Sequence, residues 1–250
     1  MSGHSHWATI KHKKGAIDAK RGKLWSKLSR AIIIAAKNGG GDPNMNLKLR
    51  YAIDKAREVS MPKDNIERAI KRGTGDIEGL VFEEITYEGF GPGGVSILVE
   101  VLTDNRNRTN GEVRKIFERG GGNMGSAGCV GYLFERKGVF AVDAAGVDED
   151  TLMGIALDAG ADDMKRAGSM FDITCEPTQF NKVQEALQKA GVATVNAEIA
   201  QIGKVPADVD AESAKKVVRL IEALDDHDDV QHVFSNVNLT EDILAEMAKE

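Results

Sequence analysis

The sequence predicts an α+β protein in which an N-terminal three-helix bundle is followed by two α+β domains, the last ferredoxin-like and inserted in the middle one. Three observations support this prediction. Apolar residues recur at helical spacing in the first third of the chain, and beyond it they alternate or form short runs typical of strands. One βαββαβ unit interrupts a second, incomplete sheet layer. The chain has 250 residues, which suits two or three compact units better than one core.

The N-terminal segment is expected to form three helices. The first carries its apolar residues on one face and ends where Asn38 precedes three glycines. The second follows Pro43, and the third begins near Pro62 and ends at Gly73. Residues 1–78 are therefore assigned to a basic N-terminal arm and a helical bundle.

A β-hairpin is predicted next, because residues 82–87 and 95–101 show the alternation typical of strands. The turn between them contains Gly89, Gly91 and Gly94, which formally match GxGxxG. That fingerprint holds a pyrophosphate only where a strand meets a helix N-terminus, whereas here it joins two strands. We therefore interpret it as a flexible hairpin tip that Pro92 stiffens at one point rather than a dinucleotide site, with a functional tip as the alternative.

A helix is predicted to begin in the polar segment of residues 103–110 and to end in the glycine run of residues 120–125. Helix capping explains the Asp, Asn and Thr residues of this segment, because their side chains can satisfy the free amides at a helix start. Capping does not require Arg106 and Arg108, whose planar donor groups suit phosphate or RNA, so a structural and a functional role fit equally well. The glycine run lacks the GK[ST] of a P-loop and is interpreted as a close-packed turn.

The remaining elements indicate a domain insertion. Residues 138–203 follow the βαββαβ order of a ferredoxin-like unit. A helix over residues 211–224 and a strand over residues 231–238 have no partner in that unit, so we expect them to complete the preceding sheet layer. The predicted domains are residues 1–78, a discontinuous α+β domain of residues 79–137 plus 204–250, and the inserted domain of residues 138–203.

Charge is distributed unevenly along the chain. The first 78 residues carry 17 Lys and Arg against 8 Asp and Glu, a net charge of +9, whereas the remaining 172 carry 16 against 31, a net charge of −15. A basic end is typical of a domain that contacts phosphates, and a solvated helix face is the alternative. The predicted nucleic-acid-binding residues are Trp7, Lys11, His12, Lys13, Lys14, Lys20, Arg21, Lys23, Lys27, Arg30, Lys63, Arg68, Lys71, Arg72, Arg106 and Arg108.

The sequence shows none of the patterns typical of an enzyme. It has no GxSxG, no HExxH and no Cys with a well-placed His, so no catalytic residue, metal or cofactor is predicted. The acidic residues around His227 are interpreted as a solvated helix-to-strand loop. Cys129 and Cys175 fit buried small hydrophobic positions. Because no apolar run is long enough for a membrane span and no secretory signal is present, a cytoplasmic location is expected.

Several long motifs resemble the YebC/PmpR family over essentially the whole chain. The sequence departs from the family pattern at His6, where Lys is usual, at Trp25, where Phe is usual, and at Cys129, where Ser is usual. The motifs are Gly3-His4-Ser5-His6-Trp7, Ile10-Lys11-His12-Lys13-Lys14, Arg21-Gly22-Lys23, Met61-Pro62-Lys63-Asp64-Asn65-Ile66, Tyr87-Glu88-Gly89-Phe90-Gly91-Pro92-Gly93-Gly94 and the segment from Thr103 to Thr109.

The resemblance implies a cytoplasmic bacterial protein of three domains that acts in gene expression. Similar proteins are described as probable transcriptional regulators that bind DNA, mitochondrial relatives as translational activators, and bacterial members are linked to relief of ribosome stalling at proline-rich stretches. The sequence shows no helix-turn-helix signature with a clear recognition helix, and a basic arm on an acidic body is suited to reading shape and phosphates more than base edges. We therefore favour a ribosome-associated translation factor that contacts ribosomal or transfer RNA. A transcriptional regulator on promoter DNA is the first alternative, and an enzyme or metal-dependent protein is the second.

Overall fold

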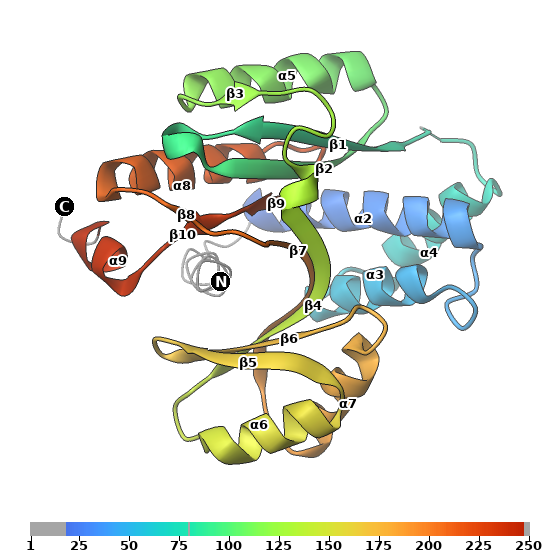
Figure 1. Cartoon of the computed structure of the whole chain (residues 1–250). Coiled ribbons are helices and arrows are strands. Elements are labelled where there is room, and N and C mark those ends of the chain that lie inside the picture. Colours follow the sequence, from blue (N-terminus) through green and yellow to red (C-terminus); the bar gives the residue numbers. More distant parts are fainter. Residues whose placement is uncertain (1–18, 80, 248–250) are drawn as a thin grey trace.

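The computed structural model describes residues 19–79 and 81–247, and within them it shows a helical domain beside two sheet-containing domains (Figure 1). In the helical domain, apolar residues 32–36 are at most 6% exposed and form the centre of the bundle. The first helix crosses the third at Gly73, where an added Cβ would lie 2.4 Å from the carbonyl oxygen of Ile33. The helices are α2 (Ala19–Gly39), α3 (Leu47–Glu58) and α4 (Lys63–Thr74).

The middle domain is a sheet of strand order β3-β1-β2-β9 with two helices packed on one face (Figure 1). Alternate residues of β1 and β2 point into the core beneath these helices, as the period-2 pattern predicts. Strand β9 pairs antiparallel with β2, so the late helix and strand complete the layer begun early in the chain. The elements are β1 (Glu83–Phe90), β2 (Ser96–Thr103), α5 (Arg106–Arg119), β3 (Asn123–Met124), α8 (Ala211–Asp225) and β9 (Val230–Ser235).

The glycine-rich hairpin tip, for which the sequence predicts flexibility, packs against α8 of the same domain. It forms a short 3₁₀ turn, η1 (Pro92–Gly94), closed by a 2.7 Å hydrogen bond from the Gly91 amide to the Val95 carbonyl. The Cα of Gly91 faces Val217 and Leu220 of α8, and a Cβ there would lie 3.6 Å from both side chains. The glycines of this turn therefore allow close contact with α8.

The ferredoxin-like domain has the strand order β5-β6-β4-β7, with both of its helices packed against one face (Figure 1). Strand β4 begins before residue 138, the expected start of this unit, because the residues from Phe134 onward already pair with β7, with Phe134 opposite Gly203. The elements are β4 (Phe134–Asp143), preceded by η2 (Gly131–Leu133), then α6 (Glu149–Asp158), β5 (Ala161–Ala167), β6 (Met170–Cys175), α7 (Phe180–Lys189) and β7 (Thr194–Gly203). Beyond them, β8 (Ala207–Asp208) pairs in parallel with β10 (Val237–Asn238), and α9 (Glu241–Met247) follows.

All three domains contact one another. The face of the middle sheet opposite α5 and α8 packs on the inserted domain through a small apolar cluster that includes Leu98, Phe234 and Ile202. The helical bundle packs on the middle domain near Leu102, and α3 reaches the inserted domain, where Tyr51 lies edge-on to Phe180 at 5.8 Å. The predicted α+β class, with a helical bundle and an inserted ferredoxin-like domain, is confirmed. No helix of the described residues is long and apolar enough to cross a membrane.

Candidate nucleic-acid interface

The predicted nucleic-acid-binding residues divide into those that the structure describes and those that it does not. The described ones form groups on α2, α4 and α5. Of Lys20 and Arg21 the structure describes only the helical backbone at the start of α2. The predicted residues outside the described ranges are Trp7, Lys11, His12, Lys13 and Lys14.

The α2 group faces an acidic loop, which we define as residues 225–229, from the last residue of α8 to the residue before β9. Lys23, Lys27 and Arg30 are spaced i, i+4 and i+7, so they share one face of the helix. The Nζ of Lys23 lies 3.7 Å from carboxylate oxygens of both Asp226 and Asp228. The other two cations pair with the carboxylates at the ends of the loop, at 3.7 Å for Lys27 and 3.1 Å for Arg30. The loop therefore neutralises this face of α2.

Backbone oxygens of the loop bind the same cations. Lys23 donates to the carbonyl of Asp226, Lys27 to that of Asp225, and Arg30 to that of Asp228. The last carbonyls of a helix have no partner within the helix and carry partial negative charge. The α2 cations therefore bind the C-terminal end of α8 as well as its acidic side chains.

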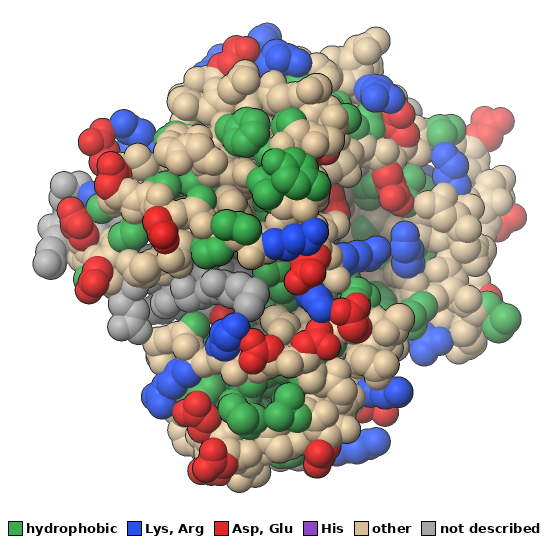
Figure 2. All heavy atoms as spheres, in the orientation of Figure 1, with side chains coloured by type: hydrophobic (Ala, Val, Ile, Leu, Met, Phe, Trp, Pro, Cys, Tyr) green, Lys and Arg blue, Asp and Glu red, His purple; other side chains and the backbone are tan. Residues whose placement is uncertain are grey.

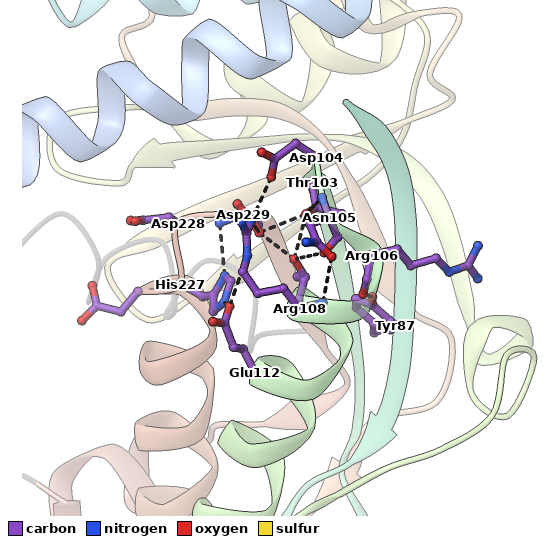
Figure 3. A network of polar contacts seen from close by, with 12 residues as sticks. Tyr87, Thr103, Asp104, Asn105, Arg106, Arg108, Glu112, His227, Asp228 and Asp229 are labelled. Atoms are coloured by element: carbon purple, nitrogen blue, oxygen red, sulfur yellow. Dashed lines mark hydrogen bonds and ion pairs between the residues drawn. The ribbon is translucent and has the colours of Figure 1, made fainter. Parts of the chain in front are cut away.

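Asp229 is the buried centre of the contact (Figure 3). Its carboxylate accepts hydrogen bonds from Thr109 Oγ1 at 2.6 Å, Thr103 Oγ1 at 3.1 Å and Arg108 Nη2 at 2.7 Å. Burial alone would raise the pKa of this carboxyl group. The hydrogen bonds from Thr109 and Arg108, together with the charge of Arg30, outweigh burial and hold the pKa below its ordinary value.

The expectation of a solvated acidic loop holds for Asp226 and Asp228, whose side chains are exposed, but it was wrong for Asp225 and Asp229. Asp229 is 2% exposed, and the side chain of Asp225 is only 27% exposed. The physical reason is that the neutralising cations come from α2, about 200 positions earlier in the chain. Within residues 19–79 and 81–247, no group of three His, Cys, Asp or Glu residues is arranged to hold a metal ion.

The two arginines at the start of α5 lie in different environments. The Arg108 side chain contacts three carboxylates, those of Asp229, Asp104 and Glu112. Its hydrogen bond to Asp229 raises its pKa. The Arg106 side chain points away from this network (Figure 3) and is exposed. Arg108 therefore stabilises the fold, whereas Arg106 is available to a ligand.

The α4 group is exposed. Arg68, Lys71 and Arg72 are spaced i, i+3 and i+4 and lie together on the solvent side of the helix. No ion pair joins these three to another residue in the part of the chain that the structure describes. Lys63, one turn earlier, makes a 3.5 Å contact with Glu67 on the same helix. On the face of the molecule in Figure 2, by contrast, basic and acidic side chains are interspersed.

Two acids near the domain contacts, the buried Glu88 and the half-buried Glu100, gave no signal in the sequence. Glu88 accepts hydrogen bonds from the amides of Gly128, Val130 and Gly131 at 2.6–2.7 Å, and these outweigh burial and lower its pKa. Glu100 lies on β2 where the domains meet, and burial raises its pKa despite a hydrogen bond with Gln201. A Glu within a strand is a weak sequence signal for a buried acid, because Glu is also common at the solvent-facing positions of strands.

The cysteines differ from each other more than the sequence indicated. Cys175 is buried as predicted, and burial raises the pKa of its thiol to about 11. Cys129 is half-buried, in the loop that Glu88 holds, and burial also raises its pKa. Neither environment favours a reactive thiolate at neutral pH.

These features define a three-domain α+β protein in which a basic helical domain is attached to an acidic body. Residues 5–76 match the TACO1/YebC protein N-terminal domain, and residues 82–237 match the TACO1/YebC second and third domain. The chain belongs to the TACO1/YebC family, which confirms the family that the motifs predicted.

Full-length relatives and a solved structure agree with this assignment. A protein of Desulfatibacillum aliphaticivorans named probable transcriptional regulatory protein is 50% identical, over 98% of this chain and 100% of its own. A protein of Rhodopirellula baltica with the same description is 52% identical over 98% and 100%. The crystal structure of Aq1575, a conserved hypothetical protein of Aquifex aeolicus, superposes with a TM-score of 0.83 at 48% identity, over 93% of this chain and 96% of that one.

Proposed function

We propose that this protein is a nucleic-acid-binding regulator of gene expression that acts as a ribosome-associated translation factor, relieving stalling through RNA contacts. The observation that carries the proposal is the exposed cluster of Arg68, Lys71 and Arg72, for which the described residues supply no acidic partner. Several cations on one helix face gain affinity for a phosphate backbone by releasing its counterions. Arg106, at the start of α5, is a further exposed cation outside this cluster.

The preference for RNA follows from what the exposed residues can read. Arg and Lys on a helix surface bind phosphates whatever the base, so they favour a structured RNA recognised by shape. The strongly acidic rest of the chain repels the same backbone, which limits contact to the helical domain. In this proposal the helical domain holds ribosomal or transfer RNA, and the protein works in the cytoplasm without a cofactor.

A DNA-binding transcriptional regulator is the second candidate. The relatives' names favour it. So does the turn of residues 59–62 between α3 and α4, because helix-turn-helix units join two helices by a turn of this length. In such a unit the second helix enters the major groove, and here that helix would be α4.

Sedimentation of the tagged full-length protein through sucrose gradients tests the proposal. The wild type is expected to comigrate with ribosomal particles at low salt, to leave them at moderate salt, and to lose comigration after nuclease treatment. The variant Arg68→Ala, Lys71→Ala, Arg72→Ala is expected to remain at the top of the gradient. Retention on promoter DNA with no ribosome association would support the transcriptional candidate instead.

A matched control keeps this test specific. Lys165, Lys182 and Lys189 are exposed lysines of the inserted domain, and replacing them with Ala removes the same charge from another surface. This control is expected to sediment like the wild type. If both triple variants lose ribosome association equally, net charge and not the α4 cluster determines binding, and the assignment of the cluster fails.

A further inference from the structure

The acidic loop binds α2 in the way that an anionic ligand would. Lys23, Lys27 and Arg30 each contact both a carboxylate and a backbone carbonyl of the loop, so oxygen atoms surround these cationic groups. Phosphate backbones present Lys and Arg with the same chemistry, since anionic oxygens accept charge-assisted hydrogen bonds from them. Successive cations rise about 6 Å and about 4.5 Å along the helix, which suits a linear row of anions.

The contact is graded from an exposed outer end to a buried inner end. At the outer end, the carboxylate side chains of Asp226 and Asp228 are 80% and 71% exposed. At the inner end, Asp229 is fixed by Thr103, Thr109 and Arg108, which belong to the middle domain itself. Exposed ion pairs contribute little stability and are screened by salt. The outer pairs can therefore exchange their anion while Asp229 keeps the loop anchored.

We propose that Lys23, Lys27 and Arg30 form a phosphate-backbone-binding surface, and that the acidic loop covers it as an intramolecular mimic which nucleic acid must displace. The inference rests on the proposed function, because it requires that the protein binds nucleic acid. It goes beyond that function by adding a second, masked surface to the exposed α4 cluster. A surface that is open only part of the time lowers the apparent affinity by the open fraction.

The test removes the mimic and measures affinity. The loop variant is Asp225→Asn, Asp226→Asn, Asp228→Asn in the full chain, with Asp229 left in place. Fluorescence anisotropy with a labelled single-stranded RNA and a double-stranded DNA of equal length gives Kd over a series of salt concentrations. The loop variant is expected to bind about tenfold more tightly than the wild type. Its log Kd is expected to depend on log salt with a slope steeper by about 2 for RNA, since about three more phosphates are neutralised.

A charge-matched control separates unmasking from a general gain of positive charge. Glu135, Asp150 and Asp158 are exposed acids on β4 and α6, far along the chain from the acidic loop, and Glu135→Gln, Asp150→Asn, Asp158→Asn adds the same charge there. This control is expected to bind like the wild type. Equal tightening in both variants overturns the inference, and so does a loop variant that binds no better than the wild type.

A second set of substitutions tests the α2 side of the contact. Adding Lys23→Gln and Lys27→Gln to the loop variant is expected to remove the gain, whereas the same two changes in the wild type are expected to alter Kd less than twofold. A gain that survives these changes places the unmasked surface elsewhere and overturns the inference. If the single variant Asp226→Asn, which removes the most exposed carboxylate, gives none of the gain, the outer end is not the mask.

The outcomes distinguish this inference from the proposed function. If binding by the wild type depends on the α4 cluster but not on the loop, the proposed function is retained and the inference of a masked α2 surface is rejected. If the wild type, the loop variant and the control all fail to bind RNA and DNA, both the proposed function and the inference are rejected. Tightening for RNA alone, or for DNA alone, identifies which backbone the α2 surface accepts.

Discussion

Helices α2 and α4 belong to the same small domain and are both basic, yet their charged faces have different surroundings. Lys23, Lys27 and Arg30 of α2 are held by the acidic loop, whereas the basic residues of the α4 cluster face solvent. Ile34 lies one turn after Arg30 on the same face of α2, and it is buried in the apolar cluster that includes Phe82 and Leu102. This face of α2 therefore packs against the middle domain, which carries the acidic loop. A basic run therefore shows an excess of charge, but the fold decides whether the protein itself supplies the counter-charge.

The largest effect is expected at the buried centre of the paired region. Asp229→Ala leaves Thr103, Thr109 and Arg108 without their shared acceptor, so we expect the free energy of unfolding to fall by about 2–4 kcal/mol. Urea denaturation followed by circular dichroism measures it. Asp150→Ala, an exposed acid on α6, serves as the control and is expected to change stability by less than about 0.5 kcal/mol.

The same variant gives a signed pH dependence. Because the pKa of Asp229 is depressed in the folded state, its contribution is complete above its unfolded-state pKa of about 3.9 and disappears as pH falls through the folded-state value. The difference in stability between wild type and Asp229→Ala is therefore expected to be constant near pH 7 and to shrink below about pH 4. A difference that grows on acidification contradicts the ion-paired assignment.

A smaller effect is expected where α2 and α4 cross. Gly73→Ala places a Cβ 2.4 Å from the Ile33 carbonyl oxygen and 2.6 Å from the Ala36 Cβ, so the helices must separate, at a cost of about 1–3 kcal/mol. Gly111→Ala is the matched control, because a Cβ at that helical position meets nothing within 4 Å. It is expected to stabilise the protein by up to about 1 kcal/mol through helix propensity. Thermal denaturation of both variants gives the comparison.

The smallest effect directly compares paired and exposed cations. Lys27→Ala removes a side chain that is only 13% exposed and binds Asp225, so a loss of about 1 kcal/mol is expected. Lys71→Ala on α4 is expected to stay within about 0.5 kcal/mol of the wild type. Both are measured by urea denaturation at low and at high salt. If the two variants lose equal stability, the structural distinction between the helices is not an energetic one.

The arginines of α5 show how far sequence reasoning reaches at the candidate site. The capping role of this segment was predictable, and the Asn105 side chain accepts a hydrogen bond from the Arg108 amide, as a capping residue does. The separation of Arg108 from Arg106 was not predictable. It depends on Asp229, whose position beside α5 is set by the pairing of β9 with β2.

The fold was more accessible from the sequence than the site. The spacing of hydrophobic residues identified the helices of the bundle and the order of strands in the inserted unit, because repeats of 3.6 and two residues reflect the local geometry of helices and strands. The close packing of the glycine run of residues 120–125 also followed, and a Cβ at Gly122 would lie 2.5 Å from the Phe90 carbonyl oxygen. The predicted domain limits, at residues 78, 137 and 203, stay a prediction.

The sequence by itself determined the α+β class, the uneven charge and the family motifs, since these are properties of local pattern and composition. Only the tertiary structure decided which charges are paired, because ion pairs such as Lys23 with Asp226 join residues that are about 200 positions apart. Electrostatic energy depends on distance and burial, and neither can be read along the chain. The tertiary structure therefore turned one basic segment into two surfaces, one occupied by the protein's own acids and one open to a partner.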